Sequence, residues 1–306
     1  MSESFKNVDI IGVPLDLGAN IRGAVAGPAA IRIAKLKKKI EVLGHSPQDL
    51  GDVYVPIRES ISRDDRELKY LHSIRDVCAT LSDYTYRSRE KGHLPITIGG
   101  DHSLAIGSLA GSAKYSKEKG ESLGLVWIDA HADLNTPDSS PSGNIHGMPM
   151  SVLLGNGHKD LTSIGFDGPK IKAENIALIG IRTIDGAERE ILKASGVNYY
   201  TMREIDERGM FTVMREALEH VKKGTSGVHL SCDLDGIDPL YAPGVSTAET
   251  GGLSYREAHL ICEMMHDQCE ITSMDFVEVN PFTDISNKTA KLAVELIQSA
   301  LGKSIT

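Results

Sequence analysis

The run LGLVWIDA, residues 123–130, is a short apolar segment that ends in an aspartate and an alanine. Similar runs recur along the chain, and several of them end in Gly, Asp or Pro: VDIIGVP (8–14), LPITIGG (94–100), NIALIGI (175–181), VNYYT (197–201), GVHLSCDLD (227–235) and ITSMDFVEV (271–279). Apolar, β-branched runs of this length predict β-strands.

Segments with the spacing of amphipathic helices lie between these runs: 66–91, 102–118, 209–223, 254–269 and 286–301. Strands that alternate with helices predict a parallel sheet covered on both faces, so we expect a three-layer α/β/α fold. The chain shows no internal repeat, no low-complexity tract and no Pro- or Ser-rich linker. We therefore expect residues 1–306 to form a single domain, since open α/β sheets of this size often do so.

Composition narrows the class of partner. Hydrophobic residues make up 41% and charged residues 25%, and the formal charge is -9 with a single tryptophan. This acidic chain has little aromatic surface for base stacking, so we expect a small cationic substrate and no nucleic acid. The N-terminus lacks the basic start of a signal peptide, and no run reaches membrane-spanning length. We expect a cytoplasmic protein without membrane contact, whose four cysteines are reduced thiols.

Potential metal ligands are concentrated at three predicted strand ends: Asp101 and His102, then Asp129, His131 and Asp133, then Asp233 and Asp235. Ligands of open parallel sheets bind beyond the carboxyl ends of the strands. In an extended chain alternate residues face the same way, about 6.6 Å apart, so each set is expected to share one face. Two strands would then hold one metal cluster.

The alternative interpretation for each aspartate is an N-cap of the following helix. It fails for the set as a whole, because four converging carboxylates would repel one another without cations. The ligands are mostly hard oxygens with two imidazoles and no thiolate, which suits Mn²⁺ better than a structural Zn²⁺ site. Four aspartates balance two divalent cations, and a bridging hydroxide leaves the cluster near minus one, which matches one guanidinium cation.

Five motifs, in this order along the chain, resemble the successive signatures of the arginases, which belong to the ureohydrolases: GGDHS (99–103), DAHAD (129–133), SGNIHGMP (142–149), DLDGIDP (233–239) and EVNP (278–281). The similarity extends from IIGVPLDLG (10–18) to near the C-terminus. The resemblance implies a mostly parallel eight-stranded sheet and hydrolysis of L-arginine to L-ornithine and urea, as in arginine metabolism and the urea cycle. It also implies assembly as a homo-trimer or homo-hexamer.

The resemblance assigns roles residue by residue. Two Mn²⁺ ions per chain are expected at His102, Asp129, His131, Asp133, Asp233 and Asp235, with Asp129 and Asp233 reaching both ions. A bridging hydroxide would attack the guanidinium carbon, and Asp133 would orient it and pass a proton to the leaving amine. His146 resembles the proton shuttle, and Glu278 would hold the guanidinium. The remaining expected substrate-binding residues are Asn135, Ser140, Ser142, Gly143, Asn144, Asp185, Glu188 and Thr247.

Two positions depart from the family pattern. Ser246, Thr247 and Ala248 stand where arginases usually read Gly-Thr-Pro, and Thr183 occupies a position that is often acidic. These changes bear on substrate affinity, not on the metal ligands. The alternatives are an agmatinase or another ureohydrolase acting on a guanidino or amidino substrate, and a non-catalytic metal-binding protein on the same fold. His229, which precedes Asp233 along its strand, is interpreted as a histidine of the core or one that supports a metal ligand from behind.

Overall fold

The computed structural model describes residues 6–62 and 68–303, so the first two residues of the helix expected over 66–91 lie outside the described part. Its strands form one sheet in the order β2-β1-β3-β8-β7-β4-β5-β6, and every pairing is parallel. The strands are β1 (Asn7–Gly12), β2 (Ser46–Asp52), β3 (Leu94–Ile98), β4 (Leu123–Ile128), β5 (Ile176–Ile181), β6 (Asn198–Thr201), β7 (Gly227–Asp233) and β8 (Ile271–Val277). The predicted α/β class and parallel sheet are confirmed.

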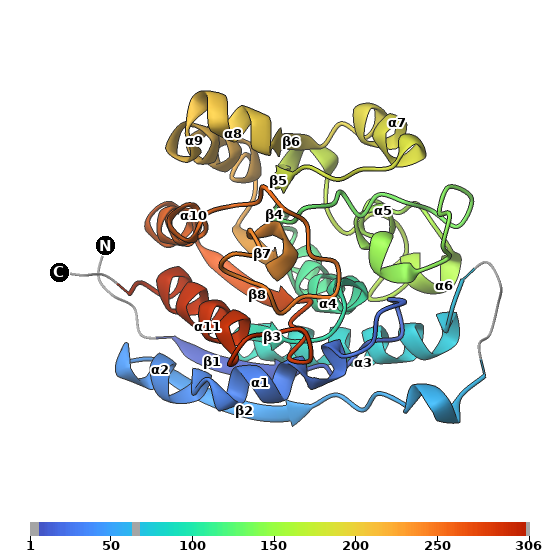
Figure 1. Cartoon of the computed structure of the whole chain (residues 1–306), viewed down its shortest axis with the longest axis horizontal. Helices are drawn as coiled ribbons and strands as arrows, with labels where there is room; N and C mark the ends of the chain where they lie inside the picture. The colour runs from blue at the N-terminus through green and yellow to red at the C-terminus, as the bar shows by residue number, and fades with distance from the viewer. Residues whose placement is uncertain (1–5, 63–67, 304–306) are drawn as a thin grey trace.

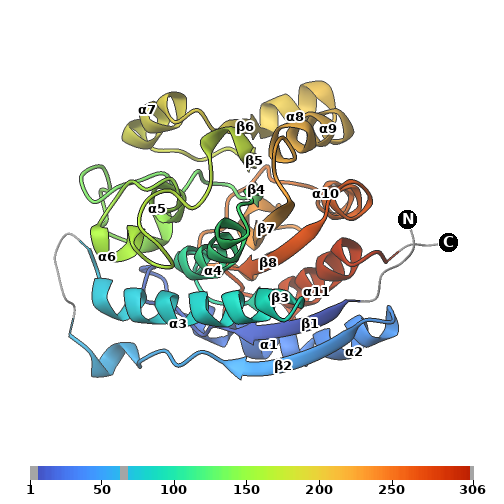
Figure 2. The same cartoon turned by 180° about the vertical axis from the view of Figure 1, so that it is seen from behind.

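Helices cover both faces of the sheet. Figure 1 shows one face, with α1 (Gly27–Ile33), α2 (Leu36–Val42), α8 (Met202–Arg208), α9 (Met210–Val221), α10 (Tyr255–Gln268) and α11 (Lys288–Ala300). Figure 2 shows the opposite face, with α3 (Leu71–Glu90), α4 (Ala105–Glu118), α5 (Pro149–Leu153), α6 (Lys159–Thr162) and α7 (Gly186–Ala194).

Strand β4 is continuously apolar because both of its faces are buried, whereas β7 and β8, in the middle of the sheet, also carry buried polar residues such as His229 and Asp275. Along β4, Val126 and Ile128 join the core under α9–α11, whereas Leu125 and Trp127 join the core under α4 and α7. Successive side chains of a strand point to opposite faces, so a strand between two helical layers is buried at every position.

All seven predicted strands are present, with ends that differ by no more than two residues from the predicted ones. The sequence reading missed β2, whose residues SPQDLGD are half-buried or exposed. This edge strand has only β1 as a neighbour, so it lacks the apolar run of a central strand. The five predicted helical segments correspond to α3, α4, α9, α10 and α11, whereas shorter helices such as α7 and α8 were not predicted.

Neighbouring strands bring distant segments to one edge of the sheet. Because β4 pairs with β7, and β7 pairs with β8, the residues that follow these strands emerge side by side. Ile128 lies opposite Cys232, so Asp129 and Asp233 leave the sheet at the same level.

The four cysteines are unpaired. None of the described helices has the length and apolar character that crossing a membrane requires.

Candidate metal centre and active site

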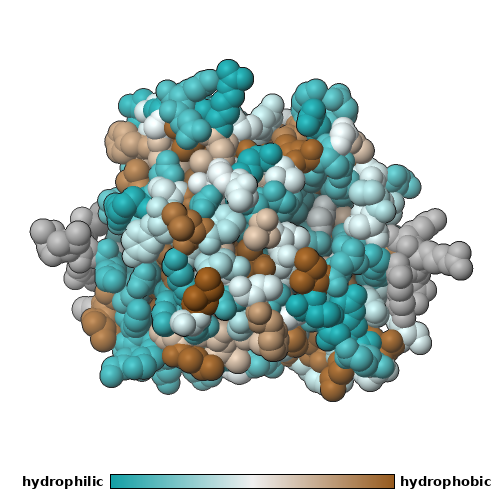
Figure 3. Space-filling view, viewed as in Figure 1, coloured by the Kyte–Doolittle hydropathy of each residue, from teal (hydrophilic) through white to brown (hydrophobic). Residues whose placement is uncertain are grey.

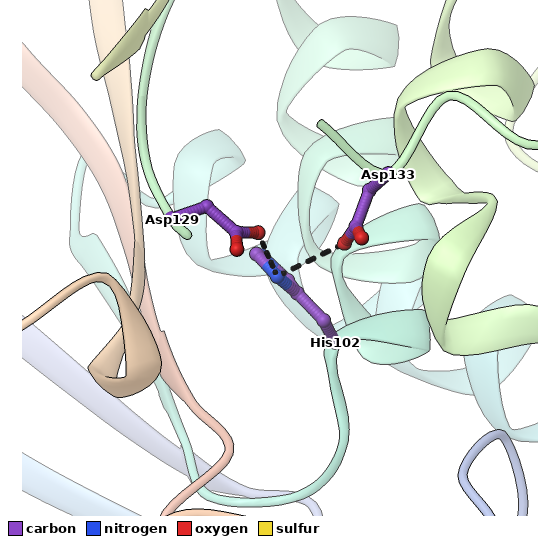
Figure 4. Close-up of side chains that lie close together, drawn as sticks. All are labelled: His102, Asp129 and Asp133. Atoms are coloured by element: carbon purple, nitrogen blue, oxygen red, sulfur yellow. Dashed lines mark ion pairs between the residues drawn. The ribbon is translucent and has the colours of Figure 1, made fainter. Parts of the chain in front are cut away.

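His102 lies directly beyond β3 and is the centre of a buried carboxylate cluster. Its Nδ1 atom is 3.1 Å from Asp129 Oδ2, 3.2 Å from Asp133 Oδ2 and 3.1 Å from Asp233 Oδ2. Figure 4 shows the Asp129 and Asp133 carboxylates converging on this nitrogen from a different segment of the chain. The imidazole stacks on the Trp127 indole, with ring centroids 3.9 Å apart, so packing fixes its plane.

A hydrogen-bonded chain behind His102 fixes the rotation of its ring. Ser231 Oγ donates to Asp275 Oδ1 at 2.5 Å, because a carboxylate can only accept. The same hydroxyl is 2.9 Å from His102 Nε2, so it accepts the Nε2 proton and leaves Nδ1 facing the carboxylates. Asp275 also accepts from Ser108 Oγ and lies 2.8 Å from His229 Nε2. His229 is thus the buried outer-shell histidine that the sequence suggested.

A second set of ligand atoms shares Asp129 with the first. His131 Nδ1 is 3.4 Å from Asp129 Oδ1 and 3.3 Å from Asp235 Oδ2. The ligand atoms of Asp129, His131 and Asp235 lie within 4.8 Å of one another, and so do those of His102, Asp129 and Asp133. The two oxygens of Asp129 therefore face different histidines, which is the arrangement of a bridging carboxylate.

The extended geometry expected for the ligand motifs is wrong. β4 ends at Ile128, and Asp133 has a left-handed backbone with a φ of 53°. Asp235 lies in a 3₁₀ turn, and its N–H donates to Asp233 Oδ1. The ligands converge because the chain bends after each strand, not because alternate residues of an extended strand share a face.

Asp101 does not belong to the cluster. It caps the 3₁₀ turn His102–Leu104, and its carboxylate accepts from the backbone N–H groups of Ser103 and Gly18. The capping interpretation, which fails for the cluster as a whole, is correct for this aspartate.

The charges in the cluster fit a pair of divalent cations. Burial and the nearby Asp129 raise the pKa of Asp133 to about 6, and burial with Asp235 and Asp129 raises the pKa of Asp233 well above its ordinary value. Burial alone would lower the pKa of His102, but the surrounding carboxylates raise it. His102 Nδ1 is buried and close to three carboxylate oxygens, but none of the described residues meets it in hydrogen-bond geometry. In the metal-free protein, protons on these side chains thus occupy positions where hard cations with oxygen and imidazole ligands would fit.

Glu278 and His146 lie together beside the cluster. Glu278 Oε1 accepts from the His102 N–H at 3.1 Å and is 3.2 Å from His146 Nδ1. Burial alone would lower the pKa of His146, but Glu278 raises it to about 9. Glu278 Oε2 is buried and has no hydrogen-bond partner within the described ranges, so this oxygen is free to accept from a cationic ligand.

A cavity of about 260 Å³ opens over the metal centre. It is lined by metal ligands, by His146 and by most of the expected substrate residues: His131, Asp133, Asn135, Ser140, Ser142, Asn144, His146, Thr183, Asp185, Glu188, Asp233, Asp235 and Thr247. Gly143 and Glu278 are not part of this lining. Gly143 has a left-handed backbone, and its N–H donates to Ser140 Oγ, which shapes the loop beside the cavity.

Several of the expected substrate residues already have hydrogen-bond partners within the protein. Asp185 caps α7 and accepts from the Asn135 amide, and Glu188 Oε1 accepts from the Leu134 N–H. Burial and the nearby Asp133 raise the pKa of Glu188 to about 7. Thr247 Oγ1 donates to the ligand Asp235 at 2.7 Å, so the loop that departs from the family pattern contacts the metal centre directly.

The sequence reading missed Arg182, which follows β5. Its guanidinium donates to the carbonyl oxygens of five residues: Gly180, Asp235, Gly236, Glu249 and Thr250. It thereby ties the Asp235 turn to the loop that carries Thr247. The only sequence signal was an arginine next to a strand end, and such residues are common on surfaces.

Comparisons with known proteins support one assignment. The Arginase family model matches residues 6–302. The arginase of Bacillus subtilis (strain 168) is 49% identical over 300 residues, which are 98% of this chain and 99% of that protein. The structure of Bacillus caldovelox arginase has a TM-score of 0.95 at 46% identity and covers 99% of this chain and 100% of its own. Entamoeba histolytica arginase in complex with L-ornithine has a TM-score of 0.90 at 31% identity, with coverage of 99% and 100%.

Proposed function

The chain belongs to the arginase family and hydrolyses L-arginine to L-ornithine and urea, and we propose that it does so with two Mn²⁺ ions held by the buried cluster. The proposed ligands are His102, Asp129, His131, Asp133, Asp233 and Asp235. One observation carries the proposal: Asp129 belongs to two groups of ligand atoms and presents one oxygen to each histidine. Oxygen ligands with two imidazoles and no thiolate favour Mn²⁺ over a structural Zn²⁺ site.

The chemistry follows from what each group does around the cavity. A pair of bound divalent cations lowers the pKa of water and so supplies a nucleophile at neutral pH. Asp133, which lines the cavity, orients this nucleophile and passes a proton to the leaving amine. His146 lies at the solvent side of the cluster with its side chain one-fifth exposed, a suitable position for carrying protons to bulk water.

Glu278 and the cavity loops select the substrate. The free Oε2 atom of Glu278 accepts a guanidinium N–H, a charge-assisted hydrogen bond. The neutral donors of Asn135, Ser140, Ser142 and Asn144 suit the α-carboxylate, and Gly143 contributes by shaping their loop. Asp185 and Glu188 suit the α-ammonium group, and Thr247 acts by holding Asp235.

The substrate assignment is tested by measuring urea release from arginine and agmatine in parallel, with Mn²⁺ added. Agmatine lacks the α-carboxylate, so the donors of the cavity loops lose their partner. We expect kcat/KM to favour arginine by a factor on the order of 10³ or more. Comparable kcat/KM values would contradict the assigned role of the cavity loops and leave the metal proposal intact.

The metal proposal is tested by elemental analysis of protein reconstituted with excess Mn²⁺. We expect two manganese ions per chain, and a stoichiometry of one or zero would falsify the binuclear site. Replacing Asp129 or Asp233 by alanine should lose more metal than replacing His102, because each of the two aspartates is proposed to contact both ions.

The remaining proposals concern the whole chain. We propose that residues 1–306, which include the undescribed segments 1–5, 63–67 and 304–306, act as one cytoplasmic catalytic domain that assembles as a homo-trimer or homo-hexamer. Support for assembly comes from exposed apolar side chains, among them Leu240, Phe282 and Ile285, although the hydrophobic residues seen in Figure 3 form separate patches. Light scattering after size-exclusion chromatography measures the assembly directly.

A further inference from the structure

A second cavity, of about 720 Å³, lies away from the metal centre on the face shown in Figure 2. It is bounded by α4, by α7 and by the segment between α6 and β5. Pockets that bind small molecules measure roughly 300–1,000 Å³, so this cavity has the size of a ligand site.

Part of the wall of this second cavity is apolar. Leu154, Phe166, Ala173 and Ile191 all line it, and each is a partly buried residue packed on the core beneath α4 and α7. The core therefore has uncovered hydrocarbon surface here. An apolar molecule of suitable size would remove that surface from water, which is favourable in proportion to the area buried.

Positive charge gathers at one side of the cavity. Lys117 Nζ lies 3.9 Å and Lys170 Nζ lies 4.5 Å from the centroid of the Phe166 ring. Lys170 is buried and donates to the carbonyl oxygens of Thr162, Phe166 and Gly168, so backbone groups satisfy it without a counter-ion. Burial and the neighbouring Lys117 lower its pKa to about 8.

The charges limit the ligand to one negative group. Lys117 and Lys172 line the cavity, and neither forms an ion pair with a carboxylate in the described part of the chain. Glu121 and Glu174 also line it. With Lys170, three ammonium groups face two carboxylates, so one added carboxylate balances the lining and a second would be repelled.

We propose that this cavity binds a small monocarboxylate with an apolar body, its carboxylate beside Lys117 and Lys172 and its body against Leu154, Phe166 and Ile191. The site is separate from the one that binds arginine. Leu134, the residue after Asp133, also lines this cavity. The Leu134 N–H donates to Glu188. A molecule bound here thus contacts the back of the loop that carries a metal ligand.

The test uses 4-phenylbutanoate as the probe and isothermal titration calorimetry on the Mn²⁺-loaded enzyme. Saturating L-ornithine is present, so that the metal centre is blocked. We expect one saturable site per chain. We expect 4-phenylbutanamide, which lacks the charge, to bind more weakly by a factor of about 10 or more. Absence of saturable binding, or equal affinity for the acid and the amide, would overturn the proposal.

Variants locate the site. Lys117→Gln should weaken binding of 4-phenylbutanoate by about 10-fold, whereas Lys119→Gln, an exposed lysine just past the end of α4 that does not line the cavity, should change it less than about twofold. Ala194→Phe, on the exposed side of α7, should fill the cavity and abolish binding. Equal affinities for the two lysine variants would contradict the proposal. Because the probe is compared with its amide on the unsubstituted enzyme, misfolding of a variant does not leave the question open.

Discussion

Two residues of the active site, Asp133 and Glu278, share an uncommon backbone conformation. Both are non-glycine residues with left-handed backbones, at φ values of 53° and 61°. Such a conformation costs on the order of 1 kcal/mol or more for a residue with a Cβ, and it persists where the surrounding structure imposes it. Glu278 is held by its N–H, which donates to the Gly100 carbonyl, and by its carboxylate on His102. The strain places each carboxylate beside His102.

His146 provides a prediction about proton transfer at the residue scale. It pairs with Glu278 and lines the cavity, but it is not among the metal-ligand groups. His146→Asn should therefore retain both metals and near-normal arginine binding, yet lose about 10-fold or more in kcat. Steady-state kinetics across pH, together with manganese analysis, measure both properties.

The matched control for this variant is His131→Asn, which removes a proposed ligand. Its metal content should fall, and added Mn²⁺ should recover part of its activity. Small imidazole buffers should rescue His146→Asn instead, by carrying the proton. A His146→Asn enzyme with unchanged kcat at every pH, or one restored by Mn²⁺ alone, would rule out the shuttle.

At the scale of elements, the metal centre depends on how the bends after β5 and β7 are tied together. Arg182 extends from the end of β5 and donates to carbonyl oxygens in the 3₁₀ turn Leu234–Gly236 and in the loop near Thr250. This planar fork reaches several backbone carbonyls at once. Burial lowers the pKa of Arg182, although Asp235 and Asp129 oppose that effect.

A prediction follows for the Arg182 contacts. Arg182→Lys keeps the charge but has no fork to reach several carbonyls, so the Asp235 turn should loosen and the cation at His131 and Asp235 should be lost first. We expect manganese content to fall towards one ion per chain and kcat/KM to fall by about 10-fold or more. The control is Arg189→Lys on the exposed face of α7, which should change neither value. An Arg182→Lys enzyme with two tightly bound ions and normal kinetics would show that the contacts are dispensable.

At the scale of the whole molecule, the cluster makes the stability of the metal-free protein depend on pH. The pKa values of Asp133 and Asp233 are raised by burial and neighbouring carboxylates, and the carboxylates around His102 raise its pKa against the effect of burial. Between pH 5 and 8 the folded metal-free chain thus holds protons that the unfolded chain has released. A group whose pKa is raised by folding contributes stability that is lost as the pH rises towards its folded value.

We therefore expect the midpoint of thermal unfolding of EDTA-treated protein to fall as the pH rises from 5 to 8. Mn²⁺ binds only after these protons leave, so the stabilisation by added Mn²⁺ should grow over the same range. Circular dichroism melts with and without Mn²⁺ measure both trends. Titration in two buffers of different ionisation enthalpy should also show proton release on Mn²⁺ binding. A stabilisation by Mn²⁺ that does not change with pH would contradict this account.

The sequence by itself determined the strand–helix alternation and the chemical type of the ligands. A strand such as β4, buried between two helical layers, is apolar on both faces, so runs such as LGLVWI can be recognised without a structure. The strand-end aspartates and histidines can likewise be recognised from the sequence, because a binuclear site needs several acidic and imidazole ligands close together. Edge strand β2 could not be recognised from the sequence. It has one neighbouring strand and is partly exposed, so its residues need not be apolar.

Only the tertiary structure decided which polar groups meet. Asp101 and Asp129 both follow a strand, yet one caps a turn against Gly18 and the other faces two histidines, because different segments pack over each. The link from His102 through Ser231 to Asp275 exists because the register of β7 and β8 places those last two residues opposite each other. Such pairings depend on contacts between residues that are distant in the sequence, such as Ser231 and Asp275 or Gly18 and Asp101, and local patterns carry no information about them.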